Sequence, residues 1–500
     1  MIAVFATPLN WLTTVLHPPA LPLERPALNV LAAAPARLPP WMAQDPVAQK
    51  YLALLGELPW DRFPERPARR PGGGPWPGRP PAPRAPSVAA FLVKRHEHKP
   101  SMGALRTYLK EHPALVWLLG FPLVADATSP WGFDVAASLP SRQPFNRVLR
   151  ELDNAALQFL LDATIPLVRA VLPAAQQAEF GRVVCGDTKA ILAWVRENNP
   201  KAFIKAGRFD PERQPAGDRD CKLGIKARHN PSPEPTVEAP PTPARAPVSA
   251  GHLQIGTEIL WGSKSGILTT RVGDWCEIVL AERTRPANES DISYFEAWLA
   301  DAERRLGFQP PSGAFDTAFD AWYTHQYFHD AGGFAAIPLP ERGRRRQRTF
   351  DAEGRPCCAA GLGMSLLLDY QDRTTSRHPQ PTGRFGCPLL HPAPTGAVCP
   401  IDEPHWPKGG CPTTTGLSAG ARLRHTLDRQ SDEYKAVYHQ RTADERLNSQ
   451  ATALGIERPT RRNQRSITNQ NTLIDVLLNL GELGRVRARR AQEEAAATGT

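Results

Sequence analysis

The stretch EYKAVYHQRTADERLNSQAT at residues 433–452 predicts a helix around which the rest of the chain is organised. It contains no glycine and no proline. Ser431 and Asp432 precede it and Gly455 follows it, and residues of these types commonly begin and end helices. We therefore expect one continuous helix over 434–452.

One face of this predicted helix carries a set of polar groups. Tyr438, Arg441 and Glu445 stand at i, i+3 and i+7, so at about 100° per residue they point the same way. Asp444 is displaced from them by about 100°, toward solvent. A carboxylate can hold a divalent metal, and a guanidinium and a hydroxyl can hold phosphate oxygens. The face therefore suits a phosphodiester site, although a solvated, charge-rich helix would show the same pattern.

The segment from Tyr438 to Glu445 reads Y-x2-R-x3-E and resembles the signature around the last catalytic carboxylate of DDE transposases from bacterial insertion sequences. The resemblance implies that Glu445 is catalytic and binds metal, while Tyr438 and Arg441 bind phosphate. Members of that family usually carry a lysine about seven residues after the glutamate, where this chain has Thr452. The resemblance also requires two aspartates upstream, each at the end of a buried strand.

The segment GRVVCGDTKAIL at 181–192 supplies the first candidate aspartate. Its β-branched run ends in Gly-Asp, which predicts a buried strand that presents Asp187 at its C-terminal end. The resemblance makes Asp187 the first catalytic and metal-binding acid. An aspartate that begins a turn or caps the next helix is the alternative.

The segment SGAFDTAFDAWYTHQYFHDAGGFAAIPLP at 312–340 supplies the second. It predicts a strand to Asp316, a helix through Tyr327 and a further strand after two glycines. The resemblance makes Asp316 catalytic and metal-binding, because it ends the strand, whereas Asp320 falls where it would cap the helix. The three candidate acids are equally spaced in the sequence, since 316 − 187 = 129 and 445 − 316 = 129. The stretch between Asp316 and Glu445 is too long for a direct connection, which predicts an insertion there.

Further strands complete the predicted catalytic domain. GTEILWG and GILTTRV should form two strands around a turn at 263–265, and WCEIVLAERT a third, followed by the helix SDISYFEAWLADAERRLGF. Residues 208–229 look like a loop. The predicted order of strands and helices is that of an α/β, ribonuclease H-like fold with a mixed sheet and flanking helices.

Composition divides the chain further. Five hundred residues exceed one hydrophobic core, and 53 prolines imply long connections. We expect an N-terminal segment (1–63), a Pro/Gly/Arg linker (64–86), a helical domain suited to binding DNA ends (87–175), the first part of the catalytic domain (176–340, with 230–247 disordered), a cysteine-containing insertion (341–430), the catalytic helix and C-terminal part (431–483), and a basic, then disordered tail (484–500). The helical domain is equally compatible with a packing module that does not contact DNA.

The net charge of +10 favours a polyanionic partner. The resemblance implies double-stranded DNA at terminal inverted repeats, together with target DNA, and a dimer on DNA. No stretch resembles a signal peptide or a membrane span, so we expect a cytoplasmic, nucleoid-associated protein without a membrane partner.

Three carboxylates suit two divalent cations, and Mg²⁺, for which Mn²⁺ can substitute, prefers such oxygen ligands. In the insertion, Cys357, Cys387, Cys399 and Cys411 leave open a structural zinc site, with Cys358, His391 or His405 as alternative ligands, against ordinary reduced cysteines.

The function that the resemblance implies is metal-dependent DNA strand cleavage and transfer at the ends of an insertion sequence. The alternatives are a domesticated or decayed transposase relative that binds DNA without cutting it, and a zinc-binding DNA-associated protein in which the three acids are incidental.

Overall fold

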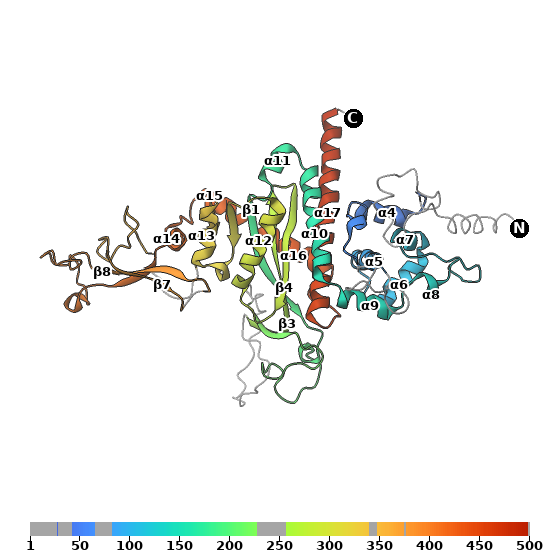
Figure 1. The fold of residues 1–500 in the computed structure, drawn as a ribbon, viewed down its shortest axis with the longest axis horizontal. Coiled ribbons are helices and arrows are strands. Elements are labelled where there is room, and N and C mark those ends of the chain that lie inside the picture. Colours follow the sequence, from blue (N-terminus) through green and yellow to red (C-terminus); the bar gives the residue numbers. More distant parts are fainter. Residues whose placement is uncertain are drawn as a thin grey trace, which may run out of the picture.

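The structure is a computed structural model that describes residues 28, 43–65, 83–227, 257–339, 348–374 and 377–498. Most of the predicted linker at 64–86, the whole segment predicted as disordered at 230–247, and most of the arginine-rich run at 341–348 lie outside the described residues. Figure 1 shows a β-arm at one end, a central sheet, the long helix α17 and a group of N-terminal helices at the other end.

The centre of the molecule is a mixed, six-stranded sheet. Its strands are β1 (Val183–Leu192), β2 (Lys222–Ala227), β3 (Thr257–Val272), β4 (Cys276–Pro286), β5 (Ser312–Phe315) and β6 (Phe334–Ala336). β1 pairs antiparallel with β3 on one side and parallel with β5 on the other, and β5 pairs parallel with β6. β2 and β4 both pair antiparallel with the far edge of β3. The expectation of an α/β fold with a mixed sheet and flanking helices is confirmed.

Two predictions about the strands are wrong. β3 is one strand of sixteen residues, without a turn at 263–265. Lys264 pairs with Ala190 of β1 and with Arg285 of β4, so its backbone is held by a partner strand on each side. The region predicted as a loop at 208–229 ends in β2, because the first half of β3 extends beyond β4 and leaves an edge that β2 covers.

Helices cover both faces of the sheet. On one face, α12 (Phe295–Leu306) places Trp298 over Gly186 and Gly266, where an added Cβ atom would lie 2.9 Å and 2.4 Å from the indole. On the other face, α15 (Asp432–His439) packs on β1, β5 and β6, and α16 (Thr442–Ala453) packs on β1 and β3. Neighbouring residues of a strand point to opposite faces, so Asp187 lies on the side of α15 and α16.

Helices dominate the N-terminal part, as expected. They are α4 (Pro46–Leu55), a 3₁₀ turn at Trp60–Arg62, α5 (Ala85–His96), α6 (Met102–Glu111), α7 (Pro113–Leu118), α8 (Val135–Ser138), α9 (Arg142–Glu151), α10 (Asn154–Val171) and α11 (Ala174–Glu179). They join the sheet through α17 (Gln464–Thr498), which packs along α10 and against β4.

The prediction of a disordered tail is wrong, because α17 continues through residues 484–498. Val486 is buried, so packing extends into this last part of the helix. Ion pairs one turn apart, Arg489 with Glu493 and Arg490 with Glu494, support its exposed side.

The insertion forms the β-arm of Figure 1, a three-stranded antiparallel sheet of β7 (Ser365–Asp372), β8 (Gln380–Gly386) and β9 (Thr413–Gly416). It returns to the body through α14 (Ala419–Thr426), which packs on α13 (Trp322–Asp330). Gly420 permits this approach, since an added Cβ atom would lie 2.3 Å from the Trp322 carbonyl oxygen and 2.4 Å from the Gln326 nitrogen.

Candidate phosphodiester site

Asp187 and Asp316 occupy corresponding places on neighbouring parallel strands. The last pair between β1 and β5 joins Gly186 to Phe315, an offset of 315 − 186 = 129. Asp187 and Asp316 are the next residues on each chain and keep that offset, since 316 − 187 = 129. Neighbouring strands lie about 4.8 Å apart, and residues in register point to the same face. The sheet therefore brings these two carboxylates together.

Asp187 and Asp316 occupy different positions on their strands, and only that of Asp187 differs from the prediction. β1 continues for five residues beyond Asp187, to Leu192, because it stays paired with β3. Asp187 therefore lies in the middle of a strand, and the prediction that it ends one is wrong. It stands where the parallel partner stops. Asp316 directly follows β5 and its Oδ1 accepts a 2.9 Å hydrogen bond from the Ala318 nitrogen at a short 3₁₀ turn, Thr317–Phe319.

Arg441 is the cation of this site. Burial lowers its pKa, but the nearby Asp187, Tyr438 and Asp316 outweigh burial and raise that pKa above its usual value. Burial also raises the pKa of Asp187 to about 6, with Arg441 opposing the rise and Asp316 adding to it. Arg441 thus lies near both aspartates, and Tyr438 lies near Arg441, while their phosphate-binding role stays a prediction.

The helix that carries Arg441 is broken, which changes the side that each acid faces. The prediction of one helix over 434–452 is wrong, because α15 ends at His439 and α16 begins at Thr442. Between the two helices, backbone hydrogen bonds join residues three positions apart, as in a 3₁₀ helix. Arg441 N donates to Tyr438 O and Asp444 N donates to Arg441 O, both at 3.1 Å. A 3₁₀ turn advances about 120° per residue instead of about 100°, so it rotates the residues that follow.

After this turn Asp444 is buried and Glu445 is exposed, so the expectation that Asp444 faces solvent is wrong. Thr269 of β3 donates a hydrogen bond to Asp444 Oδ1, while the buried Oδ2 has no hydrogen-bond partner within the described ranges. Burial, with Asp187 nearby, raises the pKa of Asp444 well above its usual value. Glu445 lies in the first turn of α16, one residue beyond.

The sequence interpretation missed two side chains near Asp187. Asn448 is nearly buried and its Nδ2 donates a 3.3 Å hydrogen bond to Asp187 Oδ2. It stands seven residues after Arg441 and four after Asp444, and this helical spacing was the available signal. Lys189, two residues beyond Asp187 on β1, shares its face.

Lys189 also bears on the residue at which the chain departs from the transposase signature. Its Nζ lies 2.8 Å from Glu457, and the hydroxyl oxygen of Thr452, which donates to the Asn448 carbonyl at 2.8 Å, lies 3.4 Å from the same carboxylate. Lys189 and Thr452 therefore both lie close to Glu457, so a lysine side chain is present near the position at which the transposase signature has a lysine and this chain has Thr452.

Asp320 has a structural role that the sequence did not indicate. Its oxygens accept 2.7 and 2.6 Å hydrogen bonds from Arg424 of α14, and His325 lies 3.3 Å away. Burial opposes ionisation, but His325 and Arg424 outweigh it and lower the pKa of Asp320 to about 2. The expected helix cap is wrong, because Ala321 precedes α13. Asp320 instead ties the insertion to the body.

In the insertion, all the described cysteines are free thiols. Burial and the nearby Cys358 and Cys387 raise the pKa of Cys411 to about 12, which places these three side chains near one another. Within the residues that the structure describes, no group of three or more His, Cys, Asp or Glu side chains is arranged to hold a metal ion. The zinc site with Cys357 and Cys399 stays a prediction.

The carboxylates at the sheet are hard oxygen donors, but within the described residues they too form no group of three that is arranged to hold a metal ion. Asp187 and Asp316 are adjacent, and of the two acids of α16 the buried Asp444, whose Oδ2 has no hydrogen-bond partner among the described residues, lies near Asp187. The predicted third ligand, Glu445, is exposed, and no hydrogen bond or ion pair within the described residues joins it to either aspartate. Oxygen ligands of this kind suit Mg²⁺ or Mn²⁺. Arg441, which lies beside both aspartates, partly neutralises them in the structure described here.

Comparison with known proteins gives no family assignment. None of the protein-family models matches the chain, and no curated protein matches it. Across the described part of the chain, no helix combines the length and apolar character needed to cross a membrane.

Proposed function

We propose that the protein is a DNA transposase that cuts and joins DNA strands at the ends of a mobile element, in a metal-dependent reaction. The observation that carries the proposal is the adjacency of Asp187 and Asp316, in register on β1 and β5, with Arg441 beside both. The Y-x2-R-x3-E segment, which resembles the signature of DDE transposases, supplies that arginine and the third acid.

The topology supports a ribonuclease H-like assignment for the catalytic domain. Leaving aside β2, the strands run β4-β3-β1-β5-β6 across the sheet, with β3 antiparallel to β1 and with β1, β5 and β6 parallel. Along the chain, with β2 again left aside, the order β1, β3, β4, α12, β5, α13 and β6 agrees with the strand–strand–strand–helix–strand–helix–strand order predicted from the sequence. Asp187 lies on β1, and Asp316 directly follows β5.

The chain's own groups have distinct parts in the proposed reaction. Asp187, Asp316 and Glu445 would hold Mg²⁺ or Mn²⁺, and such ions activate a water or a 3′-hydroxyl and stabilise the leaving oxygen of a phosphodiester. Arg441 and Tyr438 would orient the phosphate, since a guanidinium binds its oxygens in a fixed geometry. Asn448 holds the Asp187 side chain in place.

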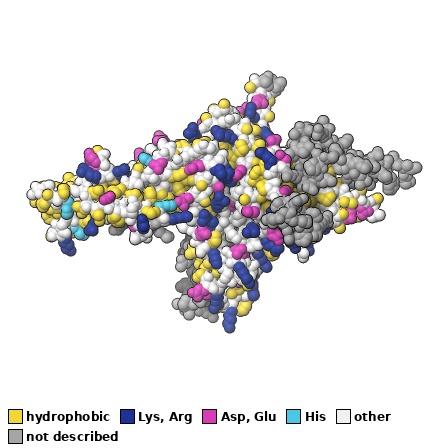
Figure 2. Space-filling view, viewed as in Figure 1, with side chains coloured by type: hydrophobic (Ala, Val, Ile, Leu, Met, Phe, Trp, Pro, Cys, Tyr) yellow, Lys and Arg dark blue, Asp and Glu magenta, His cyan; other side chains and the backbone are white. Residues whose placement is uncertain are grey.

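The partners proposed are double-stranded DNA at the element's terminal repeats and a target DNA, with a dimer acting on them. The clustering of Lys and Arg side chains over the central sheet and the loop region below it, visible in Figure 2, supports a polyanionic partner. We propose that the protein acts in the cytoplasm, on the nucleoid.

A nicking assay tests the proposed function. The substrate is a linear duplex that carries the DNA flanking the protein's own gene, labelled at one strand end, with Mg²⁺, Mn²⁺ or a chelator. The full chain should nick it at defined positions only with metal, and Asp316→Asn should not, because asparagine keeps the oxygen that accepts from Ala318 but loses the charge. Asp330→Asn, at an exposed position on α13, is the matched control and should nick normally.

The main alternative is a relative that binds DNA without cutting it. Sequence-specific binding of the flanking duplex without any metal-dependent nick would favour that alternative and refute the proposed cleavage. The departure at Thr452 is the feature of this chain that favours it.

A further inference from the structure

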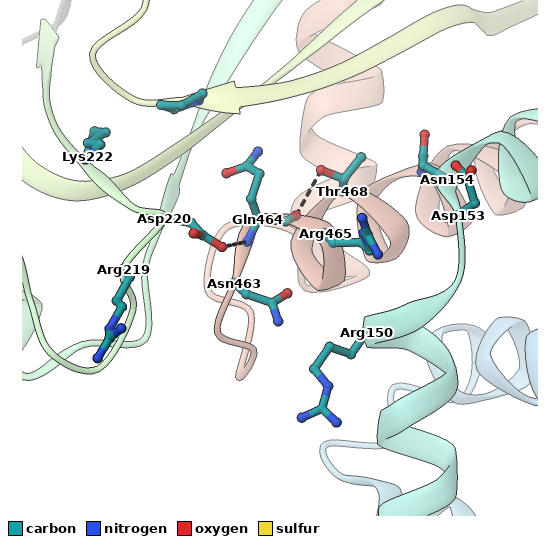
Figure 3. Close-up of a pocket in the computed structure, with 11 residues that line it drawn as sticks. Arg150, Asp153, Asn154, Arg219, Asp220, Lys222, Asn463, Gln464, Arg465 and Thr468 are labelled. Atoms are coloured by element: carbon teal, nitrogen blue, oxygen red, sulfur yellow. Dashed lines mark hydrogen bonds between the residues drawn. The ribbon is translucent and has the colours of Figure 1, made fainter.

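A second concave site lies where the N-terminal helices meet the start of α17. It is an open cleft of about 800 Å³, bounded by the end of α9, the start of α10, the loop before β2 and the first turn of α17. Figure 3 shows Arg219 and Arg150 on opposite sides of its open space, with Asn463 and the start of α17 between them. Neither Asp187, Asp316 nor any residue of α16 lines it, so it is separate from the carboxylate site.

Positive charge predominates in this cleft. Its lining includes four cationic side chains, Arg150, Arg219, Lys222 and Arg465, against two carboxylates, Asp153 and Asp220.

Both carboxylates are engaged by backbone amides. Asp153 caps α10 through a 3.1 Å hydrogen bond from the Ala155 nitrogen, and Asp220 accepts a 2.9 Å hydrogen bond from the Gln464 nitrogen at the start of α17. Asp153 and Asp220 are therefore held by the backbone at the starts of α10 and α17, and neither pairs with one of the arginines in the described part of the chain.

The arginines, in contrast, have no partner of their own. Across the described ranges, the side chains of Arg150, Arg219 and Arg465 make neither a hydrogen bond nor an ion pair, and all three are exposed. A guanidinium presents several N–H groups in a plane and matches the geometry of phosphate oxygens. Three such groups from three different segments line one cleft, which suits a ligand that carries several phosphates.

The start of α17 also faces the cleft, at Gln464. Two carboxylates already meet the partial positive charge of this helix end, because Asp220 accepts from the Gln464 nitrogen and Asp218 accepts a 3.3 Å hydrogen bond from the Asn463 nitrogen. The positive charge of the cleft therefore comes from its cationic side chains and not from the helix end.

Further cations, which are partly exposed, lie near the cleft. Arg461 stands two residues before the cleft residue Asn463 and donates to Asn146, one turn before Arg150 on α9. Arg95 donates to the Leu454 carbonyl and to Gln470, which are also neutral groups.

Lys94, beside Arg95 in the sequence, is buried. Its side chain is only 3% exposed, and burial, together with Arg95 and Arg461, lowers its pKa to about 7. The described hydrogen-bond partners of Arg95 and Arg461 are neutral groups, so these two guanidinium groups keep their charge beside the cleft, whereas Lys94 is only partly charged at neutral pH.

We propose that this cleft binds the phosphate backbone of duplex DNA and so holds a flanking part of the duplex away from the carboxylate site. The inference rests on the proposed function in taking DNA as the polyanion, but it requires no cleavage. Contacts made only to phosphates would fix the position of the duplex without reading its sequence.

The test measures binding of the full chain to short fluorescent duplexes by anisotropy, over a series of salt concentrations and with a chelator present to prevent cleavage. Arg150→Gln, Arg219→Gln and Arg465→Gln should each weaken binding, and each variant should lose the same factor in affinity for duplexes of unrelated sequence. Each should also reduce the slope of log K against log salt by about 1, the effect of one lost phosphate contact. Arg147→Gln is the matched control, since Arg147 lies on α9 outside the cleft and only approaches Glu151, at 3.9 Å.

The outcomes separate this proposal from the proposed function. If the wild-type chain binds and nicks DNA while the three variants keep its salt slope, the cleft is not a DNA site and the transposase proposal stands. If the wild-type chain binds the duplex but no nick forms, the cleft proposal survives through its salt slopes and the cleavage proposal fails. If poly-glutamate of equal charge competes as well as the duplex does, the assignment of the cleft to phosphate is overturned.

Discussion

The Asn448 side chain donates a 3.3 Å hydrogen bond to the carboxylate of Asp187, and so links the middle of α16 to the central strand of the sheet. Leu447 and Ala451, on the same side of the helix, pack with Ile191 and Ile267 of β1 and β3. The acids of α16 are therefore held in a fixed relation to Asp187 by a packed helix face, and the predictions about the site depend on that relation.

Replacing Asp187 by asparagine should stabilise the protein at neutral pH while abolishing cleavage. Burial raises the pKa of Asp187 to about 6, so above that pH the fold carries an ionised group that it disfavours. We expect Asp187→Asn to raise the free energy of unfolding at pH 7 by about 1–2 kcal/mol, after allowance for partial solvent access.

The pH dependence follows from the direction of that shift. Between about pH 4, the unfolded value, and pH 6, the folded state binds more protons than the unfolded state, so the contribution of Asp187 to stability falls as pH rises. Denaturant melts of wild type and variant should therefore diverge over this range and run parallel above it. Parallel curves throughout would contradict the raised pKa.

Glu445→Gln and Asp444→Asn should identify the third acid. If Glu445 is the metal ligand, Glu445→Gln should reduce cleavage by several orders of magnitude without affecting stability, because the residue is exposed. Asp444→Asn should change cleavage little, and stability little as well, because its raised pKa favours the neutral acid that asparagine resembles. Single-turnover nicking and thermal melts measure both. A greater loss of cleavage for Asp444→Asn would assign the third ligand to Asp444.

Arg441→Ala should weaken strand transfer more than DNA binding, since other basic residues supply non-specific affinity. Arg441 lowers the pKa of Asp187, so its removal should also move the acid limb of the pH–rate profile to higher pH. Arg446→Ala is the control, because Arg446 lies five residues after Arg441, in α16, and pairs with Glu277. Loss of binding itself with Arg441→Ala would refute the assigned role.

Gly420→Ala and Gly481→Ala should change stability in opposite directions, although both glycines are in helices. A Cβ atom at Gly420 would meet the backbone of α13 at 2.3–2.4 Å, so α14 must move away, and we expect a loss of about 1–3 kcal/mol. At Gly481 of α17 nothing lies within 4 Å of the added atom, and alanine should stabilise the helix by about 0.5–1 kcal/mol. Equal effects in chemical denaturation would show that the contact between α13 and α14 does not limit the position of the insertion.

The sequence by itself determined the strands that carry Asp187 and Asp316, the helical segment that carries Arg441, and the positive charge. These depend on local patterns of apolar and polar residues, and the equal spacing of 129 residues that separates the two aspartates is the offset that β1 and β5 keep. The N-terminal helices were predictable for the same reason, because their apolar residues recur at helical spacing.

Only the tertiary structure decided which way the acids of α16 face, the role of Asp320 and the existence of the arginine cleft. Asp444 is turned inward by a 3₁₀ turn that no residue pattern marks, and the helix register is then fixed by packing on β1 and β3. Asp320 meets Arg424 across an insertion, and Arg150, Arg219 and Arg465 come from three distant segments. Contacts of this kind depend on how separate elements pack together, and a local pattern carries no information about the partner that an element meets.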